Sequence, residues 1–478
     1  MSERIKLFKH QEDAVQKGRQ GNLALYHDCG CGKTCSAINI IKSWRRCCDG
    51  PALVVCPLSI VEAAWVEDCR KFAPELSVVN LWDSKPANRK KKLAQDHDIY
   101  VANYETFKCL FDDIQHKCFD TLIVDESSKM KSPTSQITRA LLALAGVKTR
   151  GKGGVKYPVR RIIPHRYVLS GTPAPNSMDE YWAQAKFITG PGNIVFNDNF
   201  YAFRSRYFYP IPLGRTGRQI WQFRKETQQE FQNRLAEVAH VVRKEDAVDL
   251  PEQVHEIRDV MLSKPEQQAY DQLKNDLVLS FGGEDVLATS ALVEVMKLRQ
   301  LTSGFCYGET GVHQTGKSKL NELQELLDEI GDKQVIIWAN FRHEIREILN
   351  RLPNSGAIWS GTDDREKVIL DFQRGRTKYL IANPQSAAHG LTFVNCSYAI
   401  YFSPTYSYEL QKQSQDRIHR IGQDTKCTYY YLIAKGTVDE VVYKAVNNKA
   451  ELSTEVLNYL RHGGHQHAGN SKQFSTVA

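Results

Sequence analysis

Residues 23–34 read Leu-Ala-Leu-Tyr-His-Asp-Cys-Gly-Cys-Gly-Lys-Thr. The four apolar residues at the start predict a short buried strand, and the apolar spacing of residues 33–44 predicts a helix. A glycine-rich turn between a strand and a helix is the setting of a phosphate-binding loop, since its backbone N–H groups can approach phosphate oxygens closely. We expect Lys33 to reach the β- and γ-phosphates of a nucleotide and Thr34 to bind Mg²⁺. His27 stands where the full motif has its first glycine.

Short apolar runs alternate with helical patterns in both halves of the chain. The predicted strands lie at 52–56, 99–102, 121–124 and 167–170, and again at 334–338, 357–359, 378–382 and 398–402. This alternation predicts an α/β fold with two parallel-sheet lobes. We expect a first lobe at 1–190, a largely helical insertion and linker at 191–315, a second lobe at 316–450, and a C-terminal helix and polar tail at 451–478.

The composition is that of a folded protein in water. The 478 residues carry a formal net charge of +8, and 42% of them are hydrophobic. That mild positive charge is compatible with a polyanionic partner. No apolar run is long enough to cross a bilayer, and residues 1–10 lack the apolar core of a signal peptide, so we expect a cytoplasmic protein. The 12 cysteines show no C-x-x-C spacing, and we expect neither a zinc site nor disulfides.

The predicted strand at 121–124 runs directly into Asp125 and Glu126. Ligands of open parallel sheets bind at the carboxyl ends of the strands, so these carboxylates should lie near the phosphate loop. We expect Asp125 to hold Mg²⁺ through water and Glu126 to orient and deprotonate the attacking water. An acidic turn that caps the next helix is the alternative, and the phosphate loop in the same lobe favours the catalytic interpretation.

A third pattern occupies residues 413–423, which read Gln-Ser-Gln-Asp-Arg-Ile-His-Arg-Ile-Gly-Gln. Arg417 and Arg420 are three residues apart, so we expect them to share one face of a helix. Arginine stabilises the charge that develops on a transferring phosphoryl group, and one such residue is worth roughly 10³–10⁵ in rate. If both lobes share one nucleotide, closing the cleft between them is coupled to hydrolysis. Two arginines in surface ion pairs are the alternative.

These motifs and their order resemble the superfamily-two helicases of the sucrose-non-fermenting (SWI/SNF) type, which are DNA-dependent ATPases and translocases. The chain looks like a compact phage or prophage member of that group. Further matches are Leu7-Phe-Lys-His-Gln11, Val54-Val-Cys-Pro-Leu-Ser59, Asn103-Tyr-Glu105, Ser170-Gly-Thr-Pro173 and Ile337-Trp-Ala-Asn-Phe341. Ser127 and Ser128 replace the usual Gly-His or Ala-His after the two carboxylates, and residues 386–392 depart from the fifth motif.

The resemblance implies two RecA-like lobes that use ATP and Mg²⁺ and act on DNA. It implies catalytic roles for Lys33, Asp125, Glu126, Arg417 and Arg420. It implies nucleotide contacts for Gln11, Asp28, Gly30, Gly32, Lys33, Thr34 and Gln413, with Thr34 and Asp125 as Mg²⁺ ligands. Sequence-independent DNA contacts are implied for Ser59, Asn103, Lys129, Lys131, Asn340 and Thr392.

We therefore expect an ATP-dependent DNA translocase that remodels protein–DNA complexes or branched DNA. We expect it to act as a monomer on duplex or branched DNA, in the cytoplasm of a bacterial or phage-infected cell, without a membrane partner; a protein partner is left open. A strand-separating helicase and a partner-recruited DNA-binding scaffold with weak ATPase activity are the alternatives. No wedge domain is recognisable, which favours the translocase over the helicase. The intact set of Lys33, Glu126, Arg417 and Arg420 argues against the scaffold.

Overall fold

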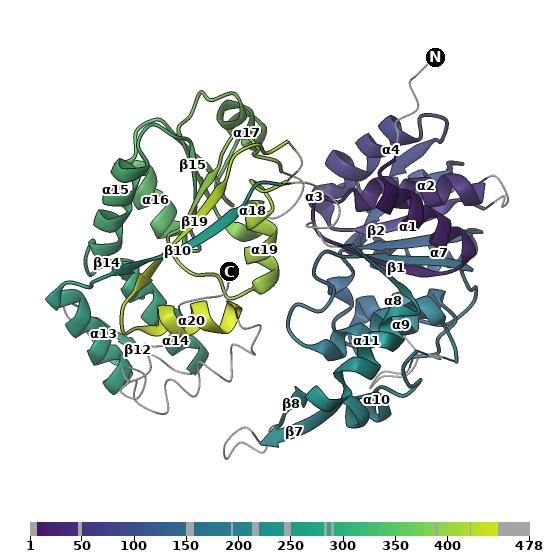
Figure 1. Cartoon of the computed structure of the whole chain (residues 1–478), viewed down its shortest axis with the longest axis horizontal. Coiled ribbons are helices and arrows are strands. Elements are labelled where there is room, and N and C mark those ends of the chain that lie inside the picture. The colour runs from purple at the N-terminus through teal and green to yellow at the C-terminus, as the bar shows by residue number, and fades with distance from the viewer. Residues whose placement is uncertain are drawn as a thin grey trace. The chain divides into compact units, whose positions relative to one another are not determined.

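The computed structural model describes residues 7–45, 50–149, 157–192, 195–212, 219–242, 250–281, 284–287, 291–387, 391–420 and 422–447. The chain divides into two compact units, Met1–Asp249 and Leu250–Ala478 (Figure 1). Each unit is built on its own parallel sheet, with helices packed against it. Among the helices described, none combines the length and the apolar character that a membrane span requires.

The first unit holds a seven-stranded sheet in the order β3-β4-β2-β5-β6-β1-β9, and every pairing is parallel. Its strands are β1 (Leu23–His27), β2 (Ala52–Cys56), β3 (Val78–Asn80), β4 (Ile99–Asn103), β5 (Thr121–Asp125), β6 (His165–Leu169) and β9 (Ala239–Val242). Strands β1, β2, β4 and β5 are buried along their whole length, which explains their continuous apolar sequence. The five strands predicted in this unit are confirmed, with β6 beginning two residues earlier than predicted.

Alternate residues of these strands face two separate cores. Leu23 and Leu25 pack with α1 (Lys9–Gln20), α2 (Lys33–Arg45), the π-helical turn η1 (Val61–Val66) and α4 (Glu67–Phe72). Ala24 and Tyr26 face the other core. That core is covered by α5 (Pro86–Ala94), α6 (Tyr104–Cys109), α7 (Phe111–His116), α8 (Gln136–Leu144), α9 (Tyr181–Thr189), α10 (Phe200–Tyr207) and α11 (Gln228–Ala236). The short turns α3 (Leu58–Ile60), η2 (Ser127–Met130), η3 (Met178–Glu180) and η5 (Lys225–Thr227) complete the unit.

The second unit holds a six-stranded parallel sheet in the order β10-β19-β18-β15-β17-β16. Its strands are β10 (Gln253–Val260), β15 (Val335–Trp338), β16 (Ser355–Ile358), β17 (Tyr379–Ala382), β18 (Tyr398–Tyr401) and β19 (Cys427–Ala434). Helices α15 (Ser318–Ile330) and α16 (Arg342–Arg351) pack on one face, and α17 (Arg365–Gln373) packs on the other. Three further helices follow β17, β18 and β19 in turn: α18 (Pro384–Ala387), α19 (Tyr408–Gln415) and α20 (Val438–Asn447). The four strands predicted here are confirmed, whereas β10 and β19 were not predicted.

The segment 191–315, expected as one largely helical insertion, is instead divided between the two units at Asp249 and Leu250. Strand β9 pairs with β1 of the first sheet, and β10 pairs with β19 of the second, so each flank belongs to its own sheet. The segment also contains three two-stranded hairpins: β7 (Phe208–Pro212) with β8 (Gln219–Phe223), β11 (Val278–Phe281) with β12 (Glu284–Leu287), and β13 (Phe305–Tyr307) with β14 (Val312–Gln314). Its helices in the second unit are α13 (Lys264–Asp276) and α14 (Ala291–Thr302). The tail expected at 451–478 lies outside the described residues.

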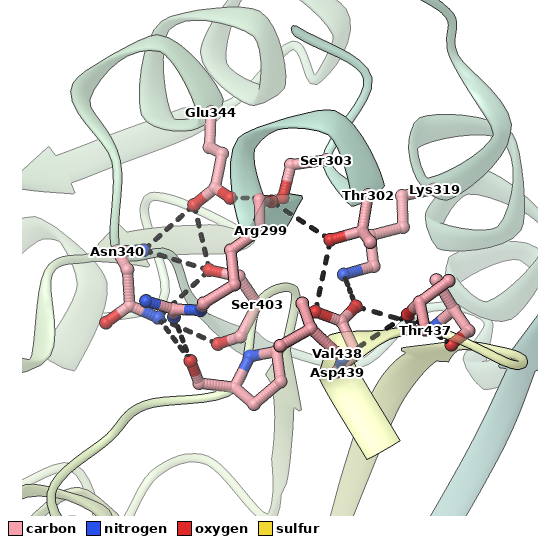
Figure 2. Close-up of polar contacts among 12 residues, drawn as sticks. Arg299, Thr302, Ser303, Lys319, Asn340, Glu344, Ser403, Thr437, Val438 and Asp439 are labelled. Atoms are coloured by element: carbon pink, nitrogen blue, oxygen red, sulfur yellow. Dashed lines mark hydrogen bonds and ion pairs between the residues drawn. The ribbon is translucent and has the colours of Figure 1, made fainter. Parts of the chain in front are cut away.

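A buried polar network fastens α14 to the second unit (Figure 2). Lys319 on α15 forms an ion pair with Asp439 at the start of α20, and both side chains are 1% exposed. Thr302 Oγ1, at the end of α14, donates to the other carboxylate oxygen of Asp439 at 3.1 Å. The neighbouring Ser303 Oγ donates to Glu344 Oε1 of α16 at 2.6 Å. These contacts explain why α14 belongs to the second unit and not to an independent insertion.

We predict that Lys319→Met lowers the free energy of unfolding of the second unit by about 3–5 kcal/mol, because it leaves the Asp439 carboxylate buried without its cation. Lys435→Met is the matched control. Its ion pair with Asp259 is about half exposed on both sides, so its loss should cost at most about 1 kcal/mol. Urea unfolding followed by circular dichroism measures both variants. Equal losses for the two would show that the buried pair has no special role.

Candidate active site

The glycine-rich turn lies between the end of β1 and the start of α2, as predicted. Gly30 and Gly32 have φ angles of 92° and 71°, in the left-handed region that glycine adopts without strain. A Cβ atom at Gly32 would lie 2.2 Å from Nε2 of Gln11, so the Gln11 amide packs directly against the turn. Gln11 is 5% exposed, and its Oε1 accepts from the backbone N–H of Phe8 at 3.0 Å. The structure therefore brings Gln11, which is predicted to contact the nucleotide, next to the predicted phosphate loop.

Lys33 begins α2 and folds back over the turn. Its Nζ donates to the backbone oxygens of His27 at 2.8 Å and Asp28 at 3.3 Å. Burial alone would lower the pKa of Lys33, but the nearby Cys29, Glu126 and Asp125 groups outweigh burial and raise it. The ammonium is therefore kept charged beside the acidic pair, which is the state that binds a phosphate.

The acidic pair sits at the carboxyl end of β5, as predicted. Asp125 is 5% exposed. Its Oδ2 accepts from Trp65 Nε1 at 2.8 Å, and its Oδ1 accepts from the backbone N–H of Glu126 at 2.9 Å. Burial raises the pKa of Asp125, although the Trp65 hydrogen bond and the Lys33 charge oppose that effect. Trp65 belongs to the π-helical turn η1, an irregularity frequent at functional sites.

Glu126 adopts an unusual backbone conformation. Its φ and ψ angles are 54° and 56°, in the left-handed region that costs a residue with a side chain about 1–3 kcal/mol. Tyr104 Oη donates to the backbone oxygens of Asp125 at 2.6 Å and Glu126 at 3.2 Å, which holds this turn in place.

Gln184 of α9 connects this turn to the next motif, and sequence reasoning missed it. Its Oε1 accepts from Ser127 Oγ at 2.7 Å and from Tyr26 Oη at 3.1 Å. Its Nε2 donates to the backbone oxygen of Pro173, in the Ser170–Pro173 motif, at 2.7 Å. Gln184 is fully buried. Ser127, which replaces the usual glycine or alanine after Glu126, is thus connected to the Ser170–Pro173 motif through the side chain of Gln184.

Histidines flank the phosphate loop, and these also were not predicted. His10 Nε2 lies 2.9 Å from the backbone oxygen of Cys31, and His27 Nε2 lies 2.8 Å from His240 Nδ1 of β9. Burial, together with the neighbouring His240 and Lys33, lowers the pKa of His27 to about 2, so this imidazole stays neutral. Only the tertiary fold reveals these contacts, because β9 lies more than 200 residues from the loop in sequence.

The oxygen donors at this end of the sheet fit Mg²⁺. Thr34 supplies a hydroxyl in the first turn of α2, and Asp125 supplies a carboxylate close enough to raise the pKa of Lys33. Such hard oxygen ligands are those that Mg²⁺ takes, together with substrate phosphates and water. Within the described residues no group of three or more His, Cys, Asp and Glu could hold a metal. A Mg²⁺ ion bound here would take phosphate oxygens and water as further ligands.

The arginines of residues 413–423 lie in a turn and not on a helix, which corrects the expectation that they share a helical face. Helix α19 ends at Gln415. The backbone N–H groups of Arg417 and Ile418 bond to oxygens three residues back, at 3.3 Å each, so the chain tightens after the helix. Arg417 Nη1 donates to the backbone oxygen of Leu391 at 2.9 Å, and Arg420 Nη1 donates to Thr392 Oγ1 at 2.7 Å. Both guanidinium groups are therefore positioned by residues 391–392.

The same turn is tied to the start of the second unit. His419 Nε2 lies 2.7 Å from the backbone oxygen of Pro251, and His419 Nδ1 lies 2.5 Å from Gln253 Nε2 of β10. Gln423 Nε2 donates to the backbone oxygen of Cys396 at 2.9 Å. Gln413, predicted to contact the nucleotide, is 2% exposed on α19. The turn that carries the arginines is thus hydrogen-bonded to Pro251 and Gln253, at the start of the second unit.

The predicted DNA contacts fall into two groups. Ser59 and Lys129 are exposed, and Lys131 is half-buried. Asn103 is 7% exposed and caps α6 by accepting from Thr106 N at 3.0 Å. Asn340 donates its amide to Ser403 Oγ at 2.9 Å and to the backbone oxygen of Ser403 at 2.8 Å (Figure 2). Asn103, Asn340 and Thr392 have hydrogen-bond partners in the structure, and their contact with DNA stays a prediction.

A phosphate loop beside an acidic pair at the end of a parallel sheet is the arrangement of nucleotide hydrolases, and the second unit repeats the α/β architecture. The sequence matches the SNF2-related domain over residues 12–150 and 159–304, and the helicase conserved C-terminal domain over residues 318–422. The chain belongs to the SNF2-related helicase family, and it is an ATP-hydrolysing enzyme with two parallel-sheet α/β units. The family resemblance seen in the sequence is thereby confirmed.

Several relatives align along most of the chain. It is 25% identical to putative protein p41 of Acyrthosiphon pisum secondary endosymbiont phage 1, covering 90% of this chain and 93% of that protein. It is 22% identical to the putative ATP-dependent helicase/translocase YwqA of Bacillus subtilis and 26% identical to the human DNA annealing helicase and endonuclease ZRANB3. The alignments cover 91% and 95% of this chain but only 46% and 41% of those proteins. Among solved structures, the Sulfolobus solfataricus SWI2/SNF2 ATPase core in complex with dsDNA aligns with a TM-score of 0.43, at 20% identity, over 95% of this chain and 93% of that one.

We predict that Gln184→Leu lowers kcat for ATP hydrolysis about tenfold while the KM for ATP changes less than about twofold. Ser127 and Pro173 lose their shared buried partner, at a cost of about 1–3 kcal/mol, but nothing in the phosphate loop is removed. Steady-state ATPase assays measure both constants. Gln115→Leu is the matched control, because it removes a buried glutamine of the same unit that bonds only to Arg160 N among the described residues. It should lower stability without changing kcat; an unchanged kcat in folded Gln184→Leu would contradict the connecting role.

Proposed function

We propose that the protein is an ATP-dependent DNA translocase that remodels protein–DNA complexes or branched DNA. This proposal rests on one observation. The first unit holds the phosphate loop and the acidic pair, and the second unit holds Arg417 and Arg420, whose guanidinium groups bond to residues 391–392. Arg417 is 8% exposed and donates to a backbone oxygen, so its side chain is buried and does not lie on the surface. An arginine held in this way at a turn is suited to contact a phosphate brought to it by the other lobe.

In the proposed cycle, Lys33 exchanges its bonds to the backbone of the turn for phosphate oxygens of ATP. Glu126 accepts the proton of the attacking water. Asp125 and Thr34 would hold Mg²⁺, and a bound Mg²⁺ would supply charge neutralisation on the phosphates. Arg417 and Arg420 close over the γ-phosphate and stabilise its developing charge. Hydrolysis releases this grip, and the two units part.

For DNA, we propose backbone contacts by Ser59, Lys129 and Lys131. Hydroxyl and ammonium groups of this kind hold phosphates without reading bases. The names of YwqA and ZRANB3 give a helicase/translocase and a DNA annealing helicase, which supports a DNA substrate for this chain. We further propose that the protein acts as a monomer in the cytoplasm of a bacterial or phage-infected cell.

We predict that Arg420→Ala lowers kcat for ATP hydrolysis by roughly 10³-fold or more, because the charge on the transferring phosphoryl group loses its stabilising guanidinium. Glu126→Gln should bind ATP but not turn it over, and Lys33→Ala should lose activity. Turnover under saturating ATP is the measurement. Arg376→Ala, which removes an exposed arginine paired with Asp371 in the same unit, should leave kcat unchanged. Normal turnover by Arg420→Ala would refute a role for the second unit in hydrolysis.

We predict that duplex DNA stimulates ATP hydrolysis more than single-stranded DNA of equal length, and that the apparent affinity for DNA falls steeply as salt rises, as phosphate contacts require. ATPase assays over a salt series with duplex, single-stranded and forked DNA measure this. Stimulation by single strands alone would favour a strand-separating helicase. A rate that no nucleic acid changes would favour the DNA-binding scaffold.

A further inference from the structure

An aromatic surface lies on the part of the first unit that carries α10 and the β7–β8 hairpin. Figure 1 shows this hairpin projecting beyond the helices of the unit. The guanidinium carbon of Arg204 lies 4.2 Å from the ring centroid of Trp221 on β8 and 5.5 Å from that of Tyr201 on α10. Tyr201 is 67% exposed. We call Tyr201, Arg204 and Trp221 the aromatic platform.

The platform stands on a rigid base. Beneath it, Phe203, Tyr207 and Phe208 are at most 2% exposed, and their rings pack on one another and on Phe231 of α11. Asn199 caps α10 by accepting from Tyr201 N at 2.8 Å. The ring of Tyr201 itself contacts that of Phe200, with 5.8 Å between the centroids, so the helix beneath Tyr201 is well packed while the tyrosine ring stays accessible.

The β7 edge of the hairpin is unsuited to strand addition. Pro210 and Pro212 alternate along β7 and lack the N–H donors that a further strand would need. Along this edge a partner would meet side chains, and the charges of those side chains indicate which partner fits. No aspartate or glutamate occurs between Asn199 and Lys225.

The described cations of this stretch are Arg204, Arg206, Arg224 and Lys225. Arg206 and Arg224 form ion pairs with Glu230 and Glu226, at 2.6 and 3.7 Å. Among the residues that the structure describes, Arg204 and Lys225 form no ion pair with an acidic side chain. A basic surface with an exposed aromatic ring is complementary to unpaired nucleic-acid bases and their phosphates.

We propose that the aromatic platform binds a single-stranded segment of DNA, with a base stacked on Tyr201 and a phosphate beside Arg204. This rests on the proposed function, because it presumes that DNA is the substrate. Paired bases in a duplex do not expose their faces, so the platform discriminates forked or branched DNA from plain duplex. It gives the enzyme a contact that recognises where strands separate, distinct from the contacts proposed for Ser59, Lys129 and Lys131.

The test is the binding of fluorescent oligothymidylate and of a fully paired duplex of equal length, at one fixed salt concentration, to the full chain. Tyr201→Ala should weaken oligothymidylate binding about tenfold and leave duplex binding within about twofold, because one base loses its stacking partner. Tyr201→Phe should retain the affinity. Arg204→Gln should weaken oligothymidylate binding more than Arg206→Gln, the matched removal of an ion-paired charge from the same helix.

The platform proposal is overturned if Tyr201→Ala binds oligothymidylate like the unaltered protein, or if it loses affinity equally for both DNAs. In that case duplex-stimulated ATP hydrolysis by the unaltered protein still supports the proposed function. Failure of the unaltered protein to bind either DNA, or to hydrolyse ATP faster with it, would end both proposals. Thermal unfolding of Tyr201→Ala, whose side chain is mostly exposed, checks that the loss is not one of folding.

Discussion

The active site of the first unit depends on one buried carboxylate, that of Asp125, which the proposed mechanism also makes a ligand of Mg²⁺. Trp65 and the backbone of Glu126 each bond one of its oxygens. An isolated buried charge would be costly, and these donors together with the Lys33 ammonium offset part of that cost, although burial still raises the pKa of Asp125. The same turn forces Glu126 into a left-handed conformation, and Tyr104 and Gln184 hold the strained segment from both sides. The position of the proposed general base is thus determined by the folding of five separate segments.

The second unit positions its arginines by a different principle. Arg417 and Arg420 lie in a turn and are directed by the backbone oxygen of Leu391 and the hydroxyl of Thr392. His419 joins the turn to Pro251 and Gln253, where the chain enters this unit. Leu391 and Thr392 therefore position the arginines, and His419 connects their turn to the first described residues of the second unit.

The sequence reveals those parts of the structure that local pattern determines. Strands such as 52–56 and 121–125 are buried on both faces and read as apolar runs, and the phosphate loop is recognisable because only glycine tolerates its backbone and the contact with Gln11.

Prediction from local sequence pattern failed where the pairing of strands distant in sequence determines the structure. Residues 191–315 looked like one insertion because β9 and β10 have no distinctive sequence, yet each is fixed by a different sheet. The aromatic and β-branched run of β19 was a usable signal that was missed. The arginine spacing suggested a helix, but the chain tightens after Gln415. Gln184, Trp65 and His240 could not be found, since each acts on a motif far away in sequence.

A crystal structure with ADP, Mg²⁺ and a planar phosphate mimic tests most directly whether the two units serve a single nucleotide. We expect Lys33 to have left the backbone oxygens of His27 and Asp28, and Arg417 and Arg420 to lie within hydrogen-bond distance of the mimic. Guanidinium groups that remain on Leu391 and Thr392, remote from a fully bound nucleotide, would contradict a shared site and the motor that follows from it.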